Sequence, residues 1–127
     1  MNALHPLVLV ALGGALGSML RYLGAAAVNR FAQSAFPWGT LFVNIVGSLL
    51  IGFIMVLLLK LGEWRESARL LLVTGIMGGF TTFSSFSWET WKLVEEGRVA
   101  WAACNIAASI GICLLATMAG ALLAKQF

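Results

Sequence analysis

Residues 75–89 read GIMGGFTTFSSFSWE and place glycines and hydroxyl side chains within an otherwise apolar chain. Glycine weakens a helix interior by about 1 kcal/mol per residue, so three of them predict a break near Gly75–Gly79, ahead of Phe80. In lipid, a broken helix persists only where protein or a water-filled cavity satisfies the freed backbone groups. The stretch therefore predicts a site through which something polar crosses a membrane.

The composition around this stretch is that of an integral membrane protein. Of 127 residues, 61% are hydrophobic and only 10% are charged, whereas a soluble domain carries about 25% charged residues. A spanning helix needs about 20 apolar residues. The uncharged runs therefore predict a single all-α domain over residues 1–127, with spans at about residues 6–28, 37–59, 70–91 and 99–124. The eight basic residues are scattered singly, which indicates loops and interface anchors rather than a nucleic-acid surface.

Three of the spans carry small or polar residues at four-residue spacing, so each set lies on one helix face. These sets are Gly13, Gly17 and Arg21; Thr40, Asn44, Ser48 and Gly52; and Asn105, Ser109, Cys113 and Thr117. Arg21 is either functional or an anchor whose guanidinium reaches the headgroups. Asn44 is a neutral amide at membrane depth, and it serves either a function or a hydrogen bond between helices.

The basic residues give the chain no preferred orientation in a membrane. Four spans put both termini and the second loop on one side, and each side then carries four Lys or Arg residues. The residues are Lys60, Arg65, Arg69 and Lys125 on one side, and Arg21, Arg30, Lys92 and Arg98 on the other. The positive-inside rule therefore allows insertion in both directions and an antiparallel pair of chains. Four short helices also enclose a polar path poorly alone, which favours a dimer.

The polar groups of the spans favour a small anion over catalysis or a cation path. No carboxylate lies within an apolar run, Glu89 being just beyond Trp88, and His5 is the sole histidine. The sequence therefore predicts no enzyme. Amides and hydroxyls donate hydrogen bonds to anions, and the edges of phenyl rings carry partial positive charge. A cation path would expose carboxylates or rings of carbonyls.

Three motifs of this chain resemble those of the Fluc (CrcB-like) fluoride ion channel family. The stretch Gly75–Glu89 resembles the main signature of that family, Gly39–Ser48 (GTLFVNIVGS) resembles a second and Gly13–Arg21 (GGALGSMLR) a third. Ser85 stands where the family commonly has threonine, and Asn105 stands where some members have tyrosine. The resemblance covers all four predicted helices.

The resemblance implies a dual-topology antiparallel homodimer with two fluoride pores in the cell (inner) membrane, surrounded by lipid. It implies passive exit of fluoride, which protects the cell, because hydrogen fluoride enters neutral and ionises inside. The implied pore residues are Asn44, Phe83, Ser84, Ser85, Phe86, Ser109 and Thr117, with Arg21, Thr40 and Asn105 as further pore or vestibule candidates. It also implies a structural sodium ion at the dimer centre, held by the backbone carbonyls of Gly78 and Thr81.

Other interpretations remain open on the residues alone. A small dual-topology multidrug or cation transporter has the same helix number, but that class needs a glutamate in its first helix, and residues 6–28 contain none. A non-transporting assembly subunit would use the polar stripes only to pack helices. A contact lined by glycine, with no ion, is likewise the alternative to the sodium site.

Overall fold

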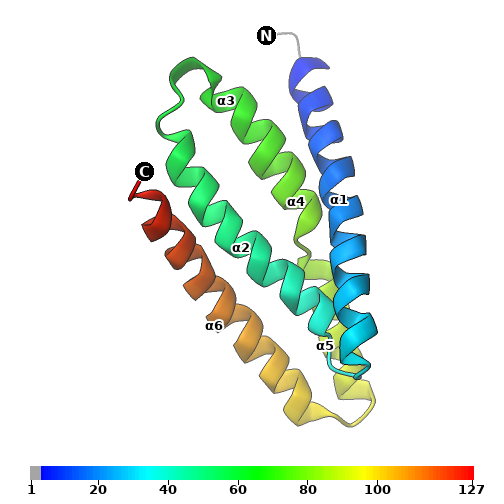
Figure 1. Cartoon of the computed structure of the whole chain (residues 1–127). Helices are drawn as coiled ribbons and strands as arrows, with labels where there is room; N and C mark the ends of the chain where they lie inside the picture. Colours follow the sequence, from blue (N-terminus) through cyan, green and yellow to red (C-terminus); the bar gives the residue numbers. More distant parts are fainter. Residues whose placement is uncertain (1–3) are drawn as a thin grey trace.

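The computed structural model describes residues 4–127 and is all-helical, as the sequence predicts (Figure 1). The elements are α1 (Leu4–Ala32), α2 (Trp38–Leu58), a 3₁₀ turn η1 (Gly62–Trp64), α3 (Arg65–Ala68), the π-helical segment η2 (Arg69–Met77), α4 (Gly78–Phe80), α5 (Phe83–Glu95) and α6 (Val99–Ala124). Within the described residues, four segments are long and apolar enough to cross a membrane: His5–Ala32, Trp38–Leu58, Gly62–Glu95 and Val99–Ala124. The chain is therefore a multi-pass protein.

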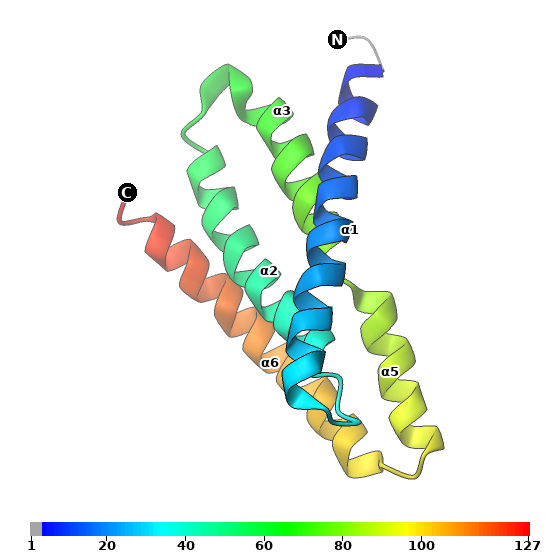
Figure 2. The ribbon, with the colours of Figure 1, turned by 45° about the vertical axis from the view of Figure 1, so that its right-hand side comes forward.

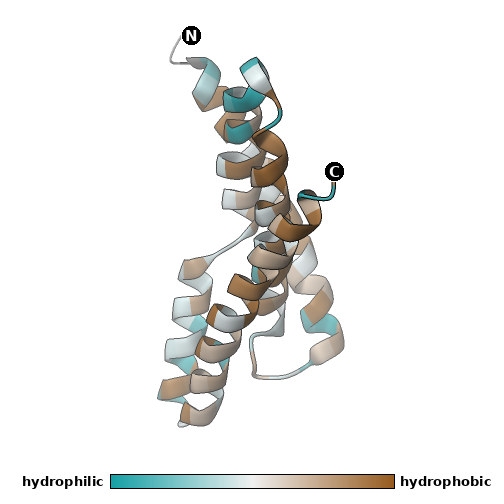
Figure 3. Cartoon of the chain, turned by 90° about the vertical axis from the view of Figure 1, so that its left-hand side faces the viewer, coloured by the Kyte–Doolittle hydropathy of each residue, from teal (hydrophilic) through white to brown (hydrophobic). Residues whose placement is uncertain are grey.

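The segments run back and forth, so that the two ends of the bundle carry different connections. The start of α1, the C-terminus and the link between α2 and α3 lie at one end, and the α1–α2 and α5–α6 turns lie at the other (Figure 1). Hydrophilic residues gather toward the ends, and brown apolar residues fill the long middle (Figure 3). The first connection is shorter than expected, because α1 continues through Asn29 to Ala32 and only residues 33–37 form the turn.

The predicted position of the break in the third segment is wrong. Gly75, Gly78 and Gly79 all lie in continuous helical structure that runs to Phe80. The chain leaves the helix at the next two residues, 81 and 82, which separate α4 from α5 (Figure 2). The glycines therefore serve a purpose other than interrupting the helix.

Two of the glycines of the third segment, Gly75 and Gly79, let its backbone touch that of α1. A Cβ atom added at Gly79 would lie 2.6 Å from the carbonyl oxygen of Gly14, and one at Gly75 would lie 2.8 Å from the Cα of Gly13. A Cβ at Gly17 would overlap the carbonyl oxygen of Ile76. Small residues at such a contact allow the close van der Waals packing that holds helices together in lipid.

Glycines also allow a close backbone contact between α2 and α6. A Cβ at Gly52 would overlap the carbonyl oxygen of Thr117, and a Cβ at Gly120 would overlap that of Leu49. These two backbones therefore pack directly, which brings the polar stripes of α2 and α6 to neighbouring faces. By contrast, many large apolar side chains elsewhere are exposed, as expected for a surface that meets lipid or another chain.

Candidate functional site

The site is built around two residues of extended backbone in the middle of the third segment. Thr81 has φ −88° and ψ 157°, and Thr82 has φ −151° and ψ 115°. These angles end α4 and start α5 in a new direction. An extended link inside a spanning segment leaves backbone N–H and C=O groups without helical partners, and each must be satisfied by other means.

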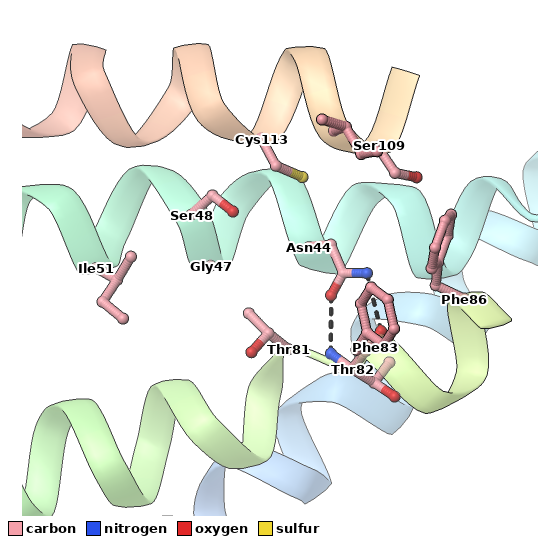
Figure 4. A pocket seen from close by; sticks show the side chains of 11 residues that line it. Asn44, Gly47, Ser48, Ile51, Thr81, Thr82, Phe83, Phe86, Ser109 and Cys113 are labelled. Atoms are coloured by element: carbon pink, nitrogen blue, oxygen red, sulfur yellow. Dashed lines mark hydrogen bonds between the residues drawn. The ribbon is translucent and has the colours of Figure 1, made fainter. Parts of the chain in front are cut away.

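Asn44 of α2 satisfies both backbone groups of Thr82. Its Nδ2 donates to the Thr82 carbonyl oxygen at 3.1 Å, and its Oδ1 accepts from the Thr82 N–H at 2.8 Å (Figure 4). The side-chain amide thus pairs with the link as a neighbouring peptide group would. Gly47, one turn later, leaves the space that Thr81 occupies, since a Cβ there would overlap Thr81 Cγ2. The second N–H of the Asn44 amide remains for another acceptor.

The link is also capped from the side of α5. The Thr82 hydroxyl accepts from the backbone N–H of Ser85 at 3.1 Å, which is the usual role of threonine at a helix N-terminus. The same hydroxyl is 3.3 Å from the hydroxyl of Ser84, which is otherwise exposed. The threonine and serine run of the motif therefore starts a helix as well as supplying polar groups.

These bonds deprive two carbonyls of the donors that a continuous helix would give them. The N–H of Thr82 would normally bond to the carbonyl of Gly78, and that of Ser85 to the carbonyl of Thr81. Here the first N–H goes to Asn44 and the second goes to the Thr82 side chain. The carbonyls of Gly78 and Thr81, named as sodium ligands by resemblance, are thus among those that lose their helical partners at the link.

A pocket of about 310 Å³ opens beside the link, between α2, α5 and α6 (Figure 4). The predicted pore residues Asn44, Phe83, Phe86 and Ser109 all line it. The two phenyl rings have centroids 5.3 Å apart and are tilted by 50°. Phe83 is 78% exposed in the single chain, so its ring stands on an open side of the pocket. The lining combines amide and hydroxyl donors with ring edges, a set suited to a small anion.

A second hollow, of about 420 Å³, lies on another side of the link. It brings together Arg21, Thr40 and Ser85, so Ser85 does not share the first pocket with the phenyl rings. Arg21 therefore lies at a polar hollow rather than only against lipid. The hollow is also lined by Glu89, whose Oε1 accepts from the Thr40 hydroxyl at 2.9 Å.

Glu89 makes contacts in the site that its position in the sequence does not predict. It follows Trp88 at the end of the apolar run, within the predicted span 70–91 and within the helical segment Gly62–Glu95. It is half-buried, and within the described residues its Oε2 has no hydrogen-bond partner. Two features of the sequence could have indicated that Glu89 belongs to the site. It ends the motif Gly75–Glu89, and Thr40, its partner, belongs to the polar face of α2.

Two remaining candidates of α6 occupy different positions. The Thr117 hydroxyl donates to the carbonyl of Cys113 in its own helix at 3.1 Å. Asn105 is buried between α6 and α5, where its Nδ2 donates to the Thr90 hydroxyl at 2.9 Å. In the described part of the chain, no group of three His, Cys, Asp or Glu side chains could hold a metal ion.

The fold and the site define a small multi-pass membrane protein with a pocket at a non-helical link inside the bundle, lined mainly by apolar surface and by a few hydrogen-bond donors. Residues 8–121 match the family described as CrcB-like protein, Camphor Resistance (CrcB), and the chain belongs to that family.

Curated relatives include a protein of Geobacter sulfurreducens, 48% identical over 117 residues that cover 92% of this chain and 94% of the relative. One from Rhizobium meliloti is 47% identical over 118 residues, covering 92% and 94%. One from Anaeromyxobacter sp. is 49% identical over 119 residues, covering 94% of each. All three are named "Fluoride-specific ion channel FluC".

Proposed function

We propose that this chain is a fluoride-selective passive channel of the cell membrane, through which fluoride leaves the cytoplasm and its toxicity falls. Membership of the CrcB-like family and the names of the relatives support this function. At the level of atoms, this function is supported by the pocket beside the link. Its lining includes neutral hydrogen-bond donors and phenyl rings, from Asn44, Phe83, Phe86 and Ser109. The predicted class is a transport protein and not an enzyme.

The pocket lining accounts for selectivity in physical terms. Fluoride is small and strongly hydrated, so an ion that enters must exchange water for closely spaced donors. The free N–H of Asn44 and the hydroxyl of Ser109 provide donors in one pocket, and the edges of the Phe83 and Phe86 rings add partial positive charge without a fixed cation. A larger, less strongly hydrated anion gains less from closely spaced donors and fits a narrow path less well.

The first prediction concerns which anion passes. Purified protein in liposomes should release trapped fluoride rapidly and release chloride at a rate close to that of protein-free liposomes. A fluoride electrode and a chloride electrode, used on matched vesicles with the same cation gradient, measure both rates. Comparable rates for the two anions would refute fluoride selectivity. No flux of either anion would favour the assembly-subunit alternative.

The proposed working unit is an antiparallel homodimer. In the single chain the pocket is open on the side where Phe83 is exposed, and a second copy would close it. The equal number of basic residues at the two ends of the bundle permits copies to insert in opposite directions. An antiparallel pair would hold one such pocket from each chain, and therefore two pores.

The second prediction tests the dual topology. In a background of Cys104→Ser and Cys113→Ala, the variants Glu63→Cys and Glu95→Cys place a thiol at opposite ends of the bundle and each remove one acidic residue. In intact cells, a membrane-impermeant maleimide should label about half of the copies of each variant, because neither orientation is preferred. The other half should react only after permeabilisation. Labelling of one variant alone would show a single orientation.

A structural sodium ion is the third part of the proposal. The freed carbonyls of Gly78 and Thr81 are hard oxygen donors that carry no competing helical bond, so they fit a sodium ion. Two such links meeting on the two-fold axis of a dimer would offer four carbonyls. The ion would supply fixed positive charge that joins the two chains. The glycine contacts with α1 hold the segment that carries these carbonyls, whether or not an ion binds.

A further inference from the structure

Asn105 is the most deeply buried large polar side chain among the described residues, with 1% of its surface exposed in the single chain. A buried amide is costly unless it is hydrogen-bonded, so a position of this kind needs a structural reason. Its burial does not depend on a second copy. The side chain lies on α6, four residues before Ser109, and meets α5 at Thr90.

The hydrogen bonds of Asn105 form a chain between two residues of the pocket lining. The Thr90 hydroxyl donates to the carbonyl of Phe86 at 2.7 Å, so its lone pairs are free to accept from Asn105 Nδ2 at 2.9 Å. At the other end, the Ser109 hydroxyl donates to Asn105 Oδ1 at 3.4 Å. The chain therefore joins Phe86 on α5 to Ser109 on α6, and both residues line the pocket.

The two ends of this chain differ in strength. The bonds through Thr90 are short and partly buried, so they fix how α5 sits on α6. The bond from Ser109 is at the long limit, and it is weak. The Ser109 hydroxyl can therefore turn from Asn105 to an anion in the pocket while Asn105 keeps its bond to Thr90.

We propose that Asn105 is a positioning residue for fluoride passage: it sets Phe86 against Ser109 across the pocket and holds the Ser109 hydroxyl ready to donate to the ion. This inference rests on the proposed function. Asn105 itself does not line the pocket and touches no ion. Thr90 is the second positioning residue, since its hydroxyl bonds both to Asn105 and to the backbone carbonyl of Phe86.

The test uses Asn105→Leu, Thr90→Val and the double variant, with Thr90→Ser as the conservative replacement that keeps the hydroxyl. Ser87→Ala is the matched control, because Ser87 also donates to a carbonyl four residues earlier on α5, that of Phe83, and makes no bond to α6. Fluoride flux into and out of liposomes is measured over a range of fluoride concentrations, together with chloride flux. The amount of folded dimer is measured by size-exclusion chromatography.

Each of Asn105→Leu and Thr90→Val should lower fluoride flux per folded dimer about tenfold, because one hydrogen-bond chain is cut. The double variant should be no worse than the more impaired single variant, as for residues that act as one unit. Thr90→Ser and Ser87→Ala should stay near the parent protein. If Asn105→Leu does not fold, the fluoride flux per folded dimer of Thr90→Val is compared with that of Thr90→Ser. A lower flux in Thr90→Val alone supports the positioning role.

Unchanged flux in Asn105→Leu or Thr90→Val, or losses that add in the double variant, would overturn the positioning role. So would a failure of Thr90→Ser to retain flux. These results differ from a failure of the proposed function, in which the parent protein itself would pass no fluoride. A loss that follows only the amount of folded dimer would make Asn105 a packing residue, which also contradicts the proposal.

Discussion

Replacement of Asn44 by aspartate should reduce fluoride efflux to the level of protein-free liposomes, a loss of about a hundredfold or more. Aspartate keeps the oxygen that accepts from the Thr82 N–H, but it puts a second oxygen where Nδ2 now donates to the Thr82 carbonyl at 3.1 Å. Two acceptors would then face each other in a partly buried site, which costs about 1–3 kcal/mol and more for a charge. The negative charge also repels the permeant anion.

Two further variants separate the causes of this loss. Asn44→Leu removes both hydrogen bonds without adding charge, so its remaining flux measures how far the link itself depends on Asn44. Ser87→Ala, on the exposed side of α5, controls for any general effect of substitution near the link. Efflux from Asn44→Asp at the parent rate, with folded dimer present, would show that Asn44 only packs.

Exhaustive removal of sodium should abolish most of the fluoride flux and shift the protein from dimer toward monomer. An unpaired carbonyl away from water costs several kcal/mol, and the proposed site would leave four of them unpaired at one contact between chains. The penalty falls on the dimer, because the carbonyls of Gly78 and Thr81 would be sealed from water only there. Return of sodium should restore both properties.

The measurement replaces sodium by N-methylglucamine at constant ionic strength throughout purification and reconstitution. Fluoride flux and the fraction of dimer, from size-exclusion chromatography with light scattering, are followed on the same sample before and after sodium is added back. N-methylglucamine is too large to enter a site of four carbonyls, so it cannot substitute. If neither property responds to sodium, the carbonyls of Gly78 and Thr81 do not hold a structural ion.

The helical segments and most of the pocket could be predicted from the sequence, because the signals are local. A run of about 20 uncharged, apolar residues can satisfy its backbone in lipid only as a helix. A four-residue spacing places Asn44 on one face of its helix and Ser109 on one face of another. The motif also brings Phe83 and Phe86 to the start of one helix, and all four residues meet at the pocket.

The position of the break could not be predicted in the same way. Glycine propensity pointed to residues 75–79, but a packed helix overrides propensity, and Gly75 and Gly79 are used where the third segment touches Gly13 and Gly14 of α1. The contact of Glu89 could not be predicted for a related reason. A charge normally marks the end of a span, and only the packing of α5 near α2 brings this carboxylate to the hydroxyl of Thr40.

The sequence by itself determined the number of spans, their apolar character and the residues that supply donors and rings, because each follows from composition and spacing along one helix. Only the tertiary structure decided where the third segment opens. The opening depends on Asn44 pairing with Thr82, groups 38 residues apart in the chain, and no local preference encodes that distance. The link is stable at residues 81 and 82 because that is where another helix supplies an amide to replace the lost helical bonds.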